Sequence, residues 1–327
     1  MKKLLLLTVS VLFLFTACSI SSLAENNSES EELDYETLGY EKLKDGVYAD
    51  YDRSKFENVT APKAYYAECV TVNDSDLRSY FSLPQYHTGR GIVFAGTECC
   101  NDFSVIFHYR FANRLEPSVE ELEFMTLSEL NERFANDVHR FVPDFRIYDL
   151  YAITTEEFAE TTTERNPPDP ERGWSEPQDF YFIRARQYVD DIPIFGGIST
   201  TGVDTLFHDG SEIEACYSKD GIENFQAIGL YTVGEEAPVN STFIDLAEAE
   251  QIIRDQYELI YPYHDLILVE CDLVYVAIFD EEGRTVLTPA WEFYEDLYAK
   301  FGPTRDWYFS LARIRINAYT GEFMRGS

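Results

Sequence analysis

The histidines and cysteines are the side chains in this sequence best suited to catalysis or metal binding, but their spacing supports neither. The chain of 327 residues has five histidines and six cysteines, and no histidine stands in a His-Glu-x-x-His or His-x-His arrangement. A thiol enzyme built on Cys99 or Cys100 with His108 would need an oriented base and a third group, which nothing in the sequence specifies. His208 and Asp209 could contribute to a metal site, but an Asp before a glycine is better explained by a turn. We therefore expect neither a metal nor a cofactor.

Sequence motifs for other enzyme classes are missing too. The chain contains no Gly-x-Ser-x-Gly elbow, no phosphate loop and no dinucleotide fingerprint. Its 59 acidic residues make paired carboxylates frequent by chance, so such pairs do not indicate a glycosidase. Our interpretation is a non-catalytic protein, with an extracellular hydrolase or a solute-binding lipoprotein as alternatives. Two carboxylates converging in a pocket would favour the hydrolase, and a deep cleft between domains would favour solute binding.

Aromatic residues near the C-terminus are the best candidates for ligand binding. Trp291, Phe293, Trp307 and Tyr308 could line a groove. However, Trp291 shares a strand face with Phe293, and the apolar stripe of a predicted helix at 246–253 needs an apolar sheet to cover it. We therefore predict that Trp291 is buried between helix and sheet, and we keep the groove as the alternative.

The first 17 residues have the pattern of a signal peptide. Lys2 and Lys3 precede an apolar run at 4–15, and small residues then lead to Cys18. The run is too short for a stable membrane span. A Cys directly after Thr-Ala resembles a bacterial lipobox, which implies that Cys18 becomes the lipid-modified first residue of the mature protein. The predicted location is the extracellular face of the cell membrane, with ordinary secretion as the alternative.

Charge and composition restrict the partners that the exported chain can bind. Residues 18–60 are rich in Ser, Asn and Glu and are predicted to form a disordered tether. The chain carries a formal net charge of −33. A surface so acidic repels nucleic acid and anionic lipid headgroups, so we expect the folded part to bind neither. It would attract a basic patch on another protein, although an acidic surface that only keeps the protein soluble explains the charge better.

Two helices are predicted from matching caps and apolar stripes. Thr126 with Glu129, and Asp245 with Glu248, have the spacing of a capping box, in which each side chain accepts a hydrogen bond from the backbone of the other residue. Apolar residues follow each cap at +1, +4, +8 and +12, which places them on one helical face. An alternating strand pattern comes after each helix. We therefore predict an α+β fold of tandem modules, each with a helix packed on a curled antiparallel sheet.

The predicted modules are an N-terminal domain at 61–235 and a C-terminal domain at 236–327. In the second domain, apolar residues alternate along 267–279, and the segment 280–283 ends in a glycine that suits a hairpin turn. The returning strand contains Pro289, which cannot donate a hydrogen bond, so this strand is predicted to lie at an edge or to contain a bulge.

Four segments of the C-terminal domain carry a family resemblance, and they include the motifs Leu-Thr-Pro-Ala-Trp and Ala-Tyr-Thr-Gly-Glu. The segments are 246–249, 270–276, 286–291 and 316–322. They resemble the PepSY-like and YycH/YycI-like C-terminal domains of Firmicute surface proteins. The resemblance implies a non-catalytic extracellular domain that binds or regulates another protein. From the tether, the pair of modules and the lack of catalytic constellations, we expect that partner to be an envelope protein, such as a sensor kinase or a protease.

Overall fold

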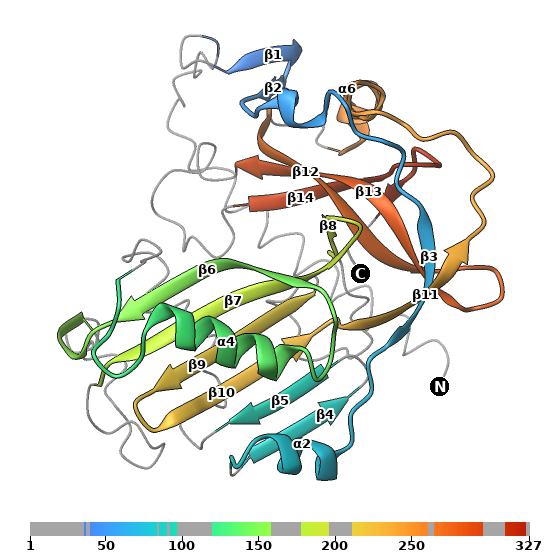
Figure 1. Ribbon diagram of the computed structural model, residues 1–327. Helices are drawn as coiled ribbons and strands as arrows, with labels where there is room; N and C mark the ends of the chain where they lie inside the picture. Colours follow the sequence, from blue (N-terminus) through green and yellow to red (C-terminus); the bar gives the residue numbers. More distant parts are fainter. Residues whose placement is uncertain are drawn as a thin grey trace, which may run out of the picture.

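The protein is built mainly from β-strands arranged in two sheets (Figure 1). The computed structural model describes residues 36, 40–83, 85–89, 92–96, 120–157, 178–195, 211–260, 265–296 and 311–324. Strands account for 49% of the described residues and helices for 19%. The predicted α+β fold of tandem helix-on-sheet modules is therefore wrong, because the strands dominate and, as described below, they do not follow the order of the chain.

The larger sheet has eight strands drawn from both ends of the chain. Its main path runs β1 (Glu41–Lys44), β2 (Val47–Ala49), β12 (Leu266–Phe279), β13 (Thr285–Asp296), β14 (Leu311–Asn317) and β15 (Phe323–Met324). Off this path, β3 (Ala64–Cys69) pairs with both β13 and β11 (Tyr231–Ala237). β2 runs parallel to β12 and the other pairs are antiparallel, so the sheet is mixed.

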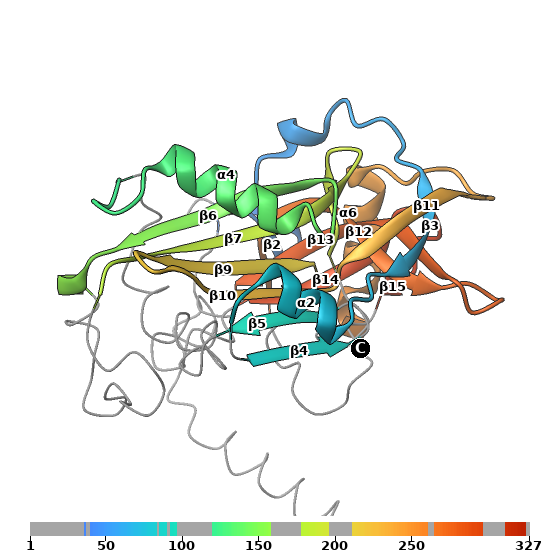
Figure 2. The same ribbon diagram turned by 60° about the horizontal axis from the view of Figure 1, so that its bottom comes forward.

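The smaller sheet has seven strands and holds the middle of the chain. Its order is β4 (Gln85–Gly89), β5 (Ile92–Gly96), β10 (Gly221–Ile228), β9 (Glu212–Ser218), β7 (Phe180–Val189) and β6 (Phe145–Ile153), with β8 (Ile192–Pro193) paired to β7. The helix α4 (Leu127–Val138) covers one face of this sheet, and the short α2 (Asp74–Tyr80) lies beside β4 (Figure 2).

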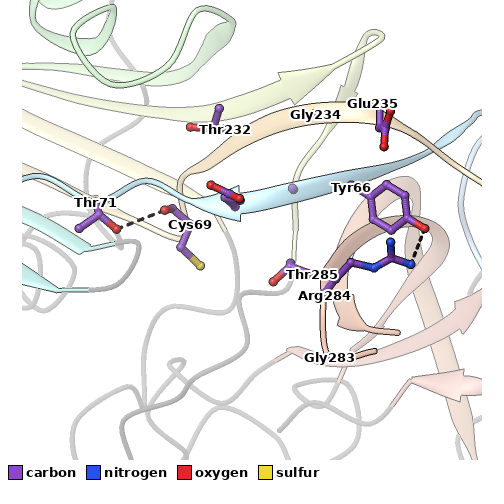
Figure 3. A pocket seen from close by; sticks show the side chains of 11 residues that line it. Tyr66, Cys69, Thr71, Thr232, Gly234, Glu235, Gly283, Arg284 and Thr285 are labelled. Carbon is purple, nitrogen blue, oxygen red and sulfur yellow. Dashed lines mark hydrogen bonds between the residues drawn. The ribbon is translucent and has the colours of Figure 1, made fainter. Parts of the chain in front are cut away.

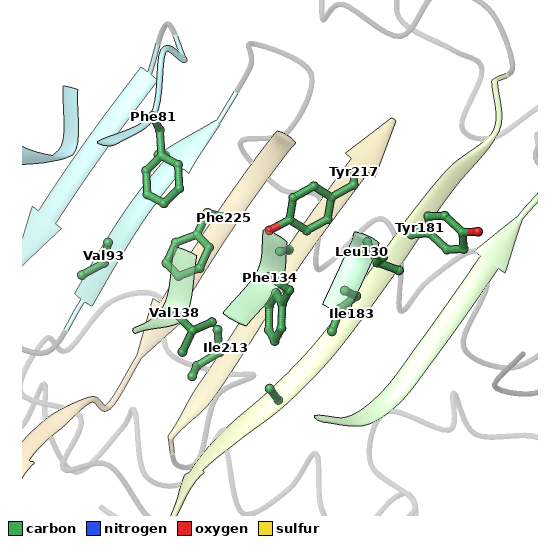
Figure 4. Close-up of a cluster of buried hydrophobic side chains, with 14 of the residues drawn as sticks. Phe81, Val93, Leu130, Phe134, Val138, Tyr181, Ile183, Ile213, Tyr217 and Phe225 are labelled. Atoms are coloured by element: carbon green, nitrogen blue, oxygen red, sulfur yellow. The ribbon is translucent and has the colours of Figure 1, made fainter. Parts of the chain in front are cut away.

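The apolar stripe of α4 forms the core of the smaller sheet. The predicted capping box is confirmed, with the Thr126 side chain and the Glu129 side chain each bonded to the backbone of the other residue. Leu130, Phe134 and Val138 are fully buried. Figure 4 shows them directed at side chains of the underlying strands, which include Ile183, Ile213, Tyr217 and Phe225. This contact removes large apolar side chains of both the helix and the sheet from water, and it therefore fixes the helix on the sheet.

The helix α6 (Leu246–Ile260) covers the larger sheet in the same way. The predicted pair of hydrogen bonds between Asp245 and Glu248 is present, at 2.8 and 3.1 Å. Trp291 of β13 is 1% exposed and lies in one core cluster with the α6 stripe, so the prediction that it is buried between helix and sheet is confirmed. Its indole Nε1 donates a 2.8 Å hydrogen bond to the Ile244 carbonyl, just before the helix.

N-terminal strands enter the C-terminal sheet, and this crossing is what the tandem prediction missed. Within the predicted tether at 18–60, the structure instead has β1, β2 and the 3-10 helix η1 (Arg53–Phe56), so a disordered chain is the wrong description of 41–56. The predicted boundary after residue 235 falls inside β11. The two sheets are also joined by a backbone hydrogen bond of 2.6 Å from Phe195, which follows β8, to Tyr275 of β12.

Pro289 marks the place where β13 changes partner. One side of β13 pairs with β12 along its length, so it is an interior strand and the predicted edge position is wrong. Its other side pairs with β3 at Val286 and Leu287 and with β14 from Ala290 onward. The Pro289 carbonyl accepts from Ala318 on that second side. Since N–H and C=O of one strand residue point the same way, the missing N–H falls between two ladders and breaks neither.

Among the described helices, none is long and apolar enough to cross a membrane.

Candidate functional site

A groove opens where β3 and β13 part. The two strands pair only at Tyr66 with Val286 and at Tyr65 with Leu287. Beyond Tyr66, β3 continues beside β11, whereas β13 turns back through Arg284 into the β12–β13 hairpin. The diverging strands enclose a cavity of about 660 Å³, which we call the wedge groove. It is lined by Tyr66, Ala67, Glu68, Cys69, Thr71, Thr232, Gly234, Glu235, Gly283, Arg284 and Thr285.

Tyr66 and Arg284 close one end of the wedge groove, and Cys69 and Thr71 lie at the other end (Figure 3). The Arg284 guanidinium carbon lies 4.2 Å from the centre of the Tyr66 ring. Its Nη2 donates a 2.7 Å hydrogen bond to the Tyr66 hydroxyl oxygen. A guanidinium stacked on an aromatic ring and bonded to its hydroxyl is held in one orientation.

The tight turn of the hairpin places Arg284. Asp280 caps the turn, because its Oδ1 accepts from the backbone amides of Glu282 at 3.0 Å and Arg284 at 2.8 Å. Gly283 has φ 78°, the left-handed conformation that favours glycine. The Arg284 side chain also contacts the carboxylates of Asp280 and Glu282, each at 2.8 Å. Its positive charge is thus already matched by the turn that carries it.

A second, smaller cavity lies on the far side of the Tyr66–Arg284 pair. Its volume is about 380 Å³, and Tyr66 and Arg284 line both spaces. Its walls include the partly apolar end of β11 with Val239, which is 37% exposed. Together the two cavities are lined by the carboxylates of Glu68, Glu235, Asp280, Glu281 and Glu282 and by the single guanidinium of Arg284. Their surface is therefore negative and favours a cationic ligand.

A row of charged side chains crosses the face of the larger sheet opposite α6. Asp272, Glu292 and Arg315 lie directly opposite one another on β12, β13 and β14. Arg315 Nε donates to Glu292 Oε1 at 2.5 Å, and the Tyr294 hydroxyl donates to Glu292 Oε2 at 2.7 Å. Burial and then the nearby charges of Glu270 and Glu292 raise the pKa of Asp272 to about 6, against smaller opposing effects of basic side chains.

Paired carboxylates with different proton affinities are the arrangement that acid–base enzymes use. Here, however, Glu292 is completely buried and both of its oxygens accept hydrogen bonds within the sheet. Such a carboxylate organises Arg315 and Tyr294 rather than meeting a substrate. Neither Asp272 nor Glu292 lines either of the two cavities.

The aromatic residues expected from the sequence are not brought together in a groove. Trp291 and Phe293 are core residues, 1% and 0% exposed, so the groove alternative is wrong for both. Trp307, Tyr308 and Cys18 lie outside the described residues, as do the considered catalytic and metal candidates Cys99, Cys100, His108, His208 and Asp209. Within the described part of the chain, no three His, Cys, Asp or Glu side chains gather in a way that could hold a metal ion.

Sequence reasoning identified the hairpin turn but missed the groove beside it. The Asp280–Gly283 turn is visible locally, and Arg284 directly follows it. Its partner Tyr66 stands 218 positions earlier in the chain, on a strand that was assigned to the other domain. A pattern of local spacing contains no signal for a contact of that separation.

Comparisons with known proteins bear on the fold alone. No protein-family model and no curated protein matches the chain. Among solved structures, it is similar to the crystal structure of an uncharacterized protein from Eubacterium rectale ATCC 33656, with 13% sequence identity and a TM-score of 0.54. The match covers 88% of this chain and 92% of that chain. The resemblance to PepSY-like and YycH/YycI-like domains stays a prediction.

Proposed function

We propose that the protein is a cell-surface lipoprotein that binds a basic segment of an envelope protein in the wedge groove, without catalysing a reaction. The observation that carries this proposal is an open cavity whose lining is acidic, on a chain with the sequence pattern of an exported lipoprotein. Binding or regulating another protein is also the role that the family resemblance implies, and for an anchored chain we expect an envelope protein, such as a sensor kinase or a protease.

The placement of charge around the groove supports a basic protein partner. Glu68 and Glu235 are exposed and stand on neighbouring strands, β3 and β11. Exposed charges lose little hydration on contact, so they mainly speed association with a surface of opposite sign and select against acidic partners. Arg284 offsets the acidic lining only in part, because its one positive charge lies against the two carboxylates of Asp280 and Glu282.

Charge reversal in the groove tests the proposal. The mature chain and its Glu68→Lys/Glu235→Lys variant are each immobilised and incubated with solubilised membranes of the producing cells. A Glu123→Lys/Glu132→Lys variant is the matched control, because Glu132 lies in α4 and Glu123 just before it, both are exposed, and the net charge changes equally. The expected result is a membrane protein retained by the wild type and the control but lost with the groove variant. Equal retention by all three chains would refute the groove as the binding site.

The anchor is tested separately. Cys18→Ala should release the protein from the membrane fraction into the medium with its fold intact, because the lipid attachment point is gone. A variant that stays in the membrane fraction would show that the hydrophobic segment itself is retained as the anchor.

A further inference from the structure

The register of β3 and β13 shows which backbone the wedge groove leaves open. If their antiparallel pairing continued past Tyr66 and Val286, it would place Ala67, Glu68 and Cys69 opposite Thr285, Arg284 and Gly283. These pairs do not form, and all six residues line the groove instead. Within the described chain, the stretch 67–69 of β3 therefore has no strand beside it on the hairpin side.

The other side of the same stretch is fully paired, which holds it extended. Ala67, Glu68 and Cys69 lie opposite Val233, Thr232 and Tyr231 of β11. On the open side, alternate residues direct their backbone groups toward the groove: Ala67 and Cys69, because Val70 bonds to Leu230 on the β11 side. The Cys69 carbonyl accepts one long hydrogen bond, at 3.4 Å from Thr71 Oγ1. Such an edge is a template for another strand.

The outer edge of the sheet is protected, in contrast to the groove. Among the described strands, β11 pairs only with β3, so it ends this side of the sheet. Its register with β3 shifts between Val233 and Glu236, and the bulged stretch includes Gly234 and the exposed Glu235. Bulges and charges are the features with which natural sheets prevent pairing at an edge. The sheet thus blocks its outer edge and leaves the inner one open.

We propose that the wedge groove binds its partner by strand addition: an extended segment of the partner pairs with the open edge of β3 at 67–69. This inference rests on the function proposed above and specifies its binding mode. Three residues of strand span about 10 Å, so a short segment suffices. In this mode backbone hydrogen bonds supply affinity and alternate side chains supply specificity.

The two faces of β3 define the chemistry of that segment. Ala67 and Cys69 share one face and contact an apolar cluster, whereas Glu68 belongs to the opposite face and is exposed. An added strand keeps the same alternation. The segment should therefore alternate basic side chains, directed to the acidic side of the groove, with small apolar ones.

A synthetic peptide of alternating Lys and Val is the probe for this mode, tested on the full mature chain. The control peptide has the same sequence with alternate backbone nitrogens methylated, which keeps its charge and side chains but removes hydrogen-bond donors. The unmethylated peptide should bind at least about tenfold more tightly, because two or more backbone hydrogen bonds are lost in the control. It should also slow amide hydrogen exchange in 67–70 and 284–285 and slow alkylation of the half-buried Cys69 thiol.

Each outcome decides between strand addition and the broader proposal. Equal affinity of both peptides, or protection that does not include 67–70, overturns strand addition, and so does a peptide that does not bind. If charge reversal at Glu68 and Glu235 still abolishes partner retention in that case, groove binding stands and only its mode is refuted. If neither partner nor peptide responds to the charge reversal, both proposals fail.

Discussion

The two ends of β13 lie in different environments, although they belong to one strand. Around Trp291 and Phe293 the strand is flanked by β12 and β14 and covered by α6, and both side chains are buried. At Thr285 it has only β12 beside it, and the adjoining Arg284 is exposed. The first end contributes apolar burial, whereas the second, where Thr285 is buried, adjoins the exposed charge of Arg284 at the wedge groove. The residues that stabilise the fold are thus separated from the proposed binding groove along one strand of 12 residues.

The largest expected effect is the loss of stability caused by substituting Trp291, at the buried end of β13. Trp291→Ala removes a buried indole and its hydrogen bond to Ile244, so the free energy of unfolding should fall by about 3–5 kcal/mol, measured by urea denaturation. Trp291→Phe is the control: it keeps an aromatic ring and should lose only about 1–2 kcal/mol, chiefly the hydrogen bond. An unchanged midpoint for the Ala variant would contradict the core assignment.

A smaller, pH-dependent effect on the free energy of unfolding is expected at Asp272, near the middle of β12. Its pKa is raised to about 6, so the folded protein binds this proton more tightly than the unfolded chain, whose carboxyl titrates near pH 4. The stability linked to the proton is fully present below pH 4 and is lost as the pH rises through 6. Asp272→Asn should therefore stabilise the protein at pH 7–8 by about 1–2 kcal/mol, a value reduced for partial exposure of the carboxylate.

The difference between wild type and Asp272→Asn across pH 4–8 isolates this group from all other titrations. It should shrink toward zero near pH 4. A difference that stays constant over the range would mean that the ionisation of Asp272 is not what the substitution removes.

The smallest effect on stability, and one that separates recognition from folding, is expected at Arg284. Arg284→Ala removes an exposed group, so the thermal midpoint should stay close to that of the wild type. Among the described lining residues it also removes the one guanidinium, which leaves carboxylates as their charged groups, so the Lys-Val peptide should associate roughly two- to tenfold faster at low salt. The gain should disappear in high salt. Slower association would indicate that Arg284 itself contacts the ligand. Tyr66→Phe, which keeps the ring and the net charge, is the control and should not speed association.

Local features of this protein were predictable because neighbours in sequence decide them. The capping boxes at Thr126 and Asp245 formed as expected, since each requires only residues within one helical turn. The burial of Trp291 followed from strand alternation and the apolar stripe of the preceding helix. The turn at Asp280–Gly283 followed from its glycine.

The sequence by itself therefore determined the two helices, their buried faces, the hairpin and the acidity of the surface. Only the tertiary structure decided that β1, β2 and β3 join the C-terminal sheet, because strand pairing across some 200 residues depends on which edges remain open after the rest has folded. The wedge groove results from this pairing of β3 with strands of the C-terminal sheet. It exists because β3 pairs with β11 from Ala64 to Cys69 on one side but with β13 at only two residues on the other, a register that no local spacing encodes.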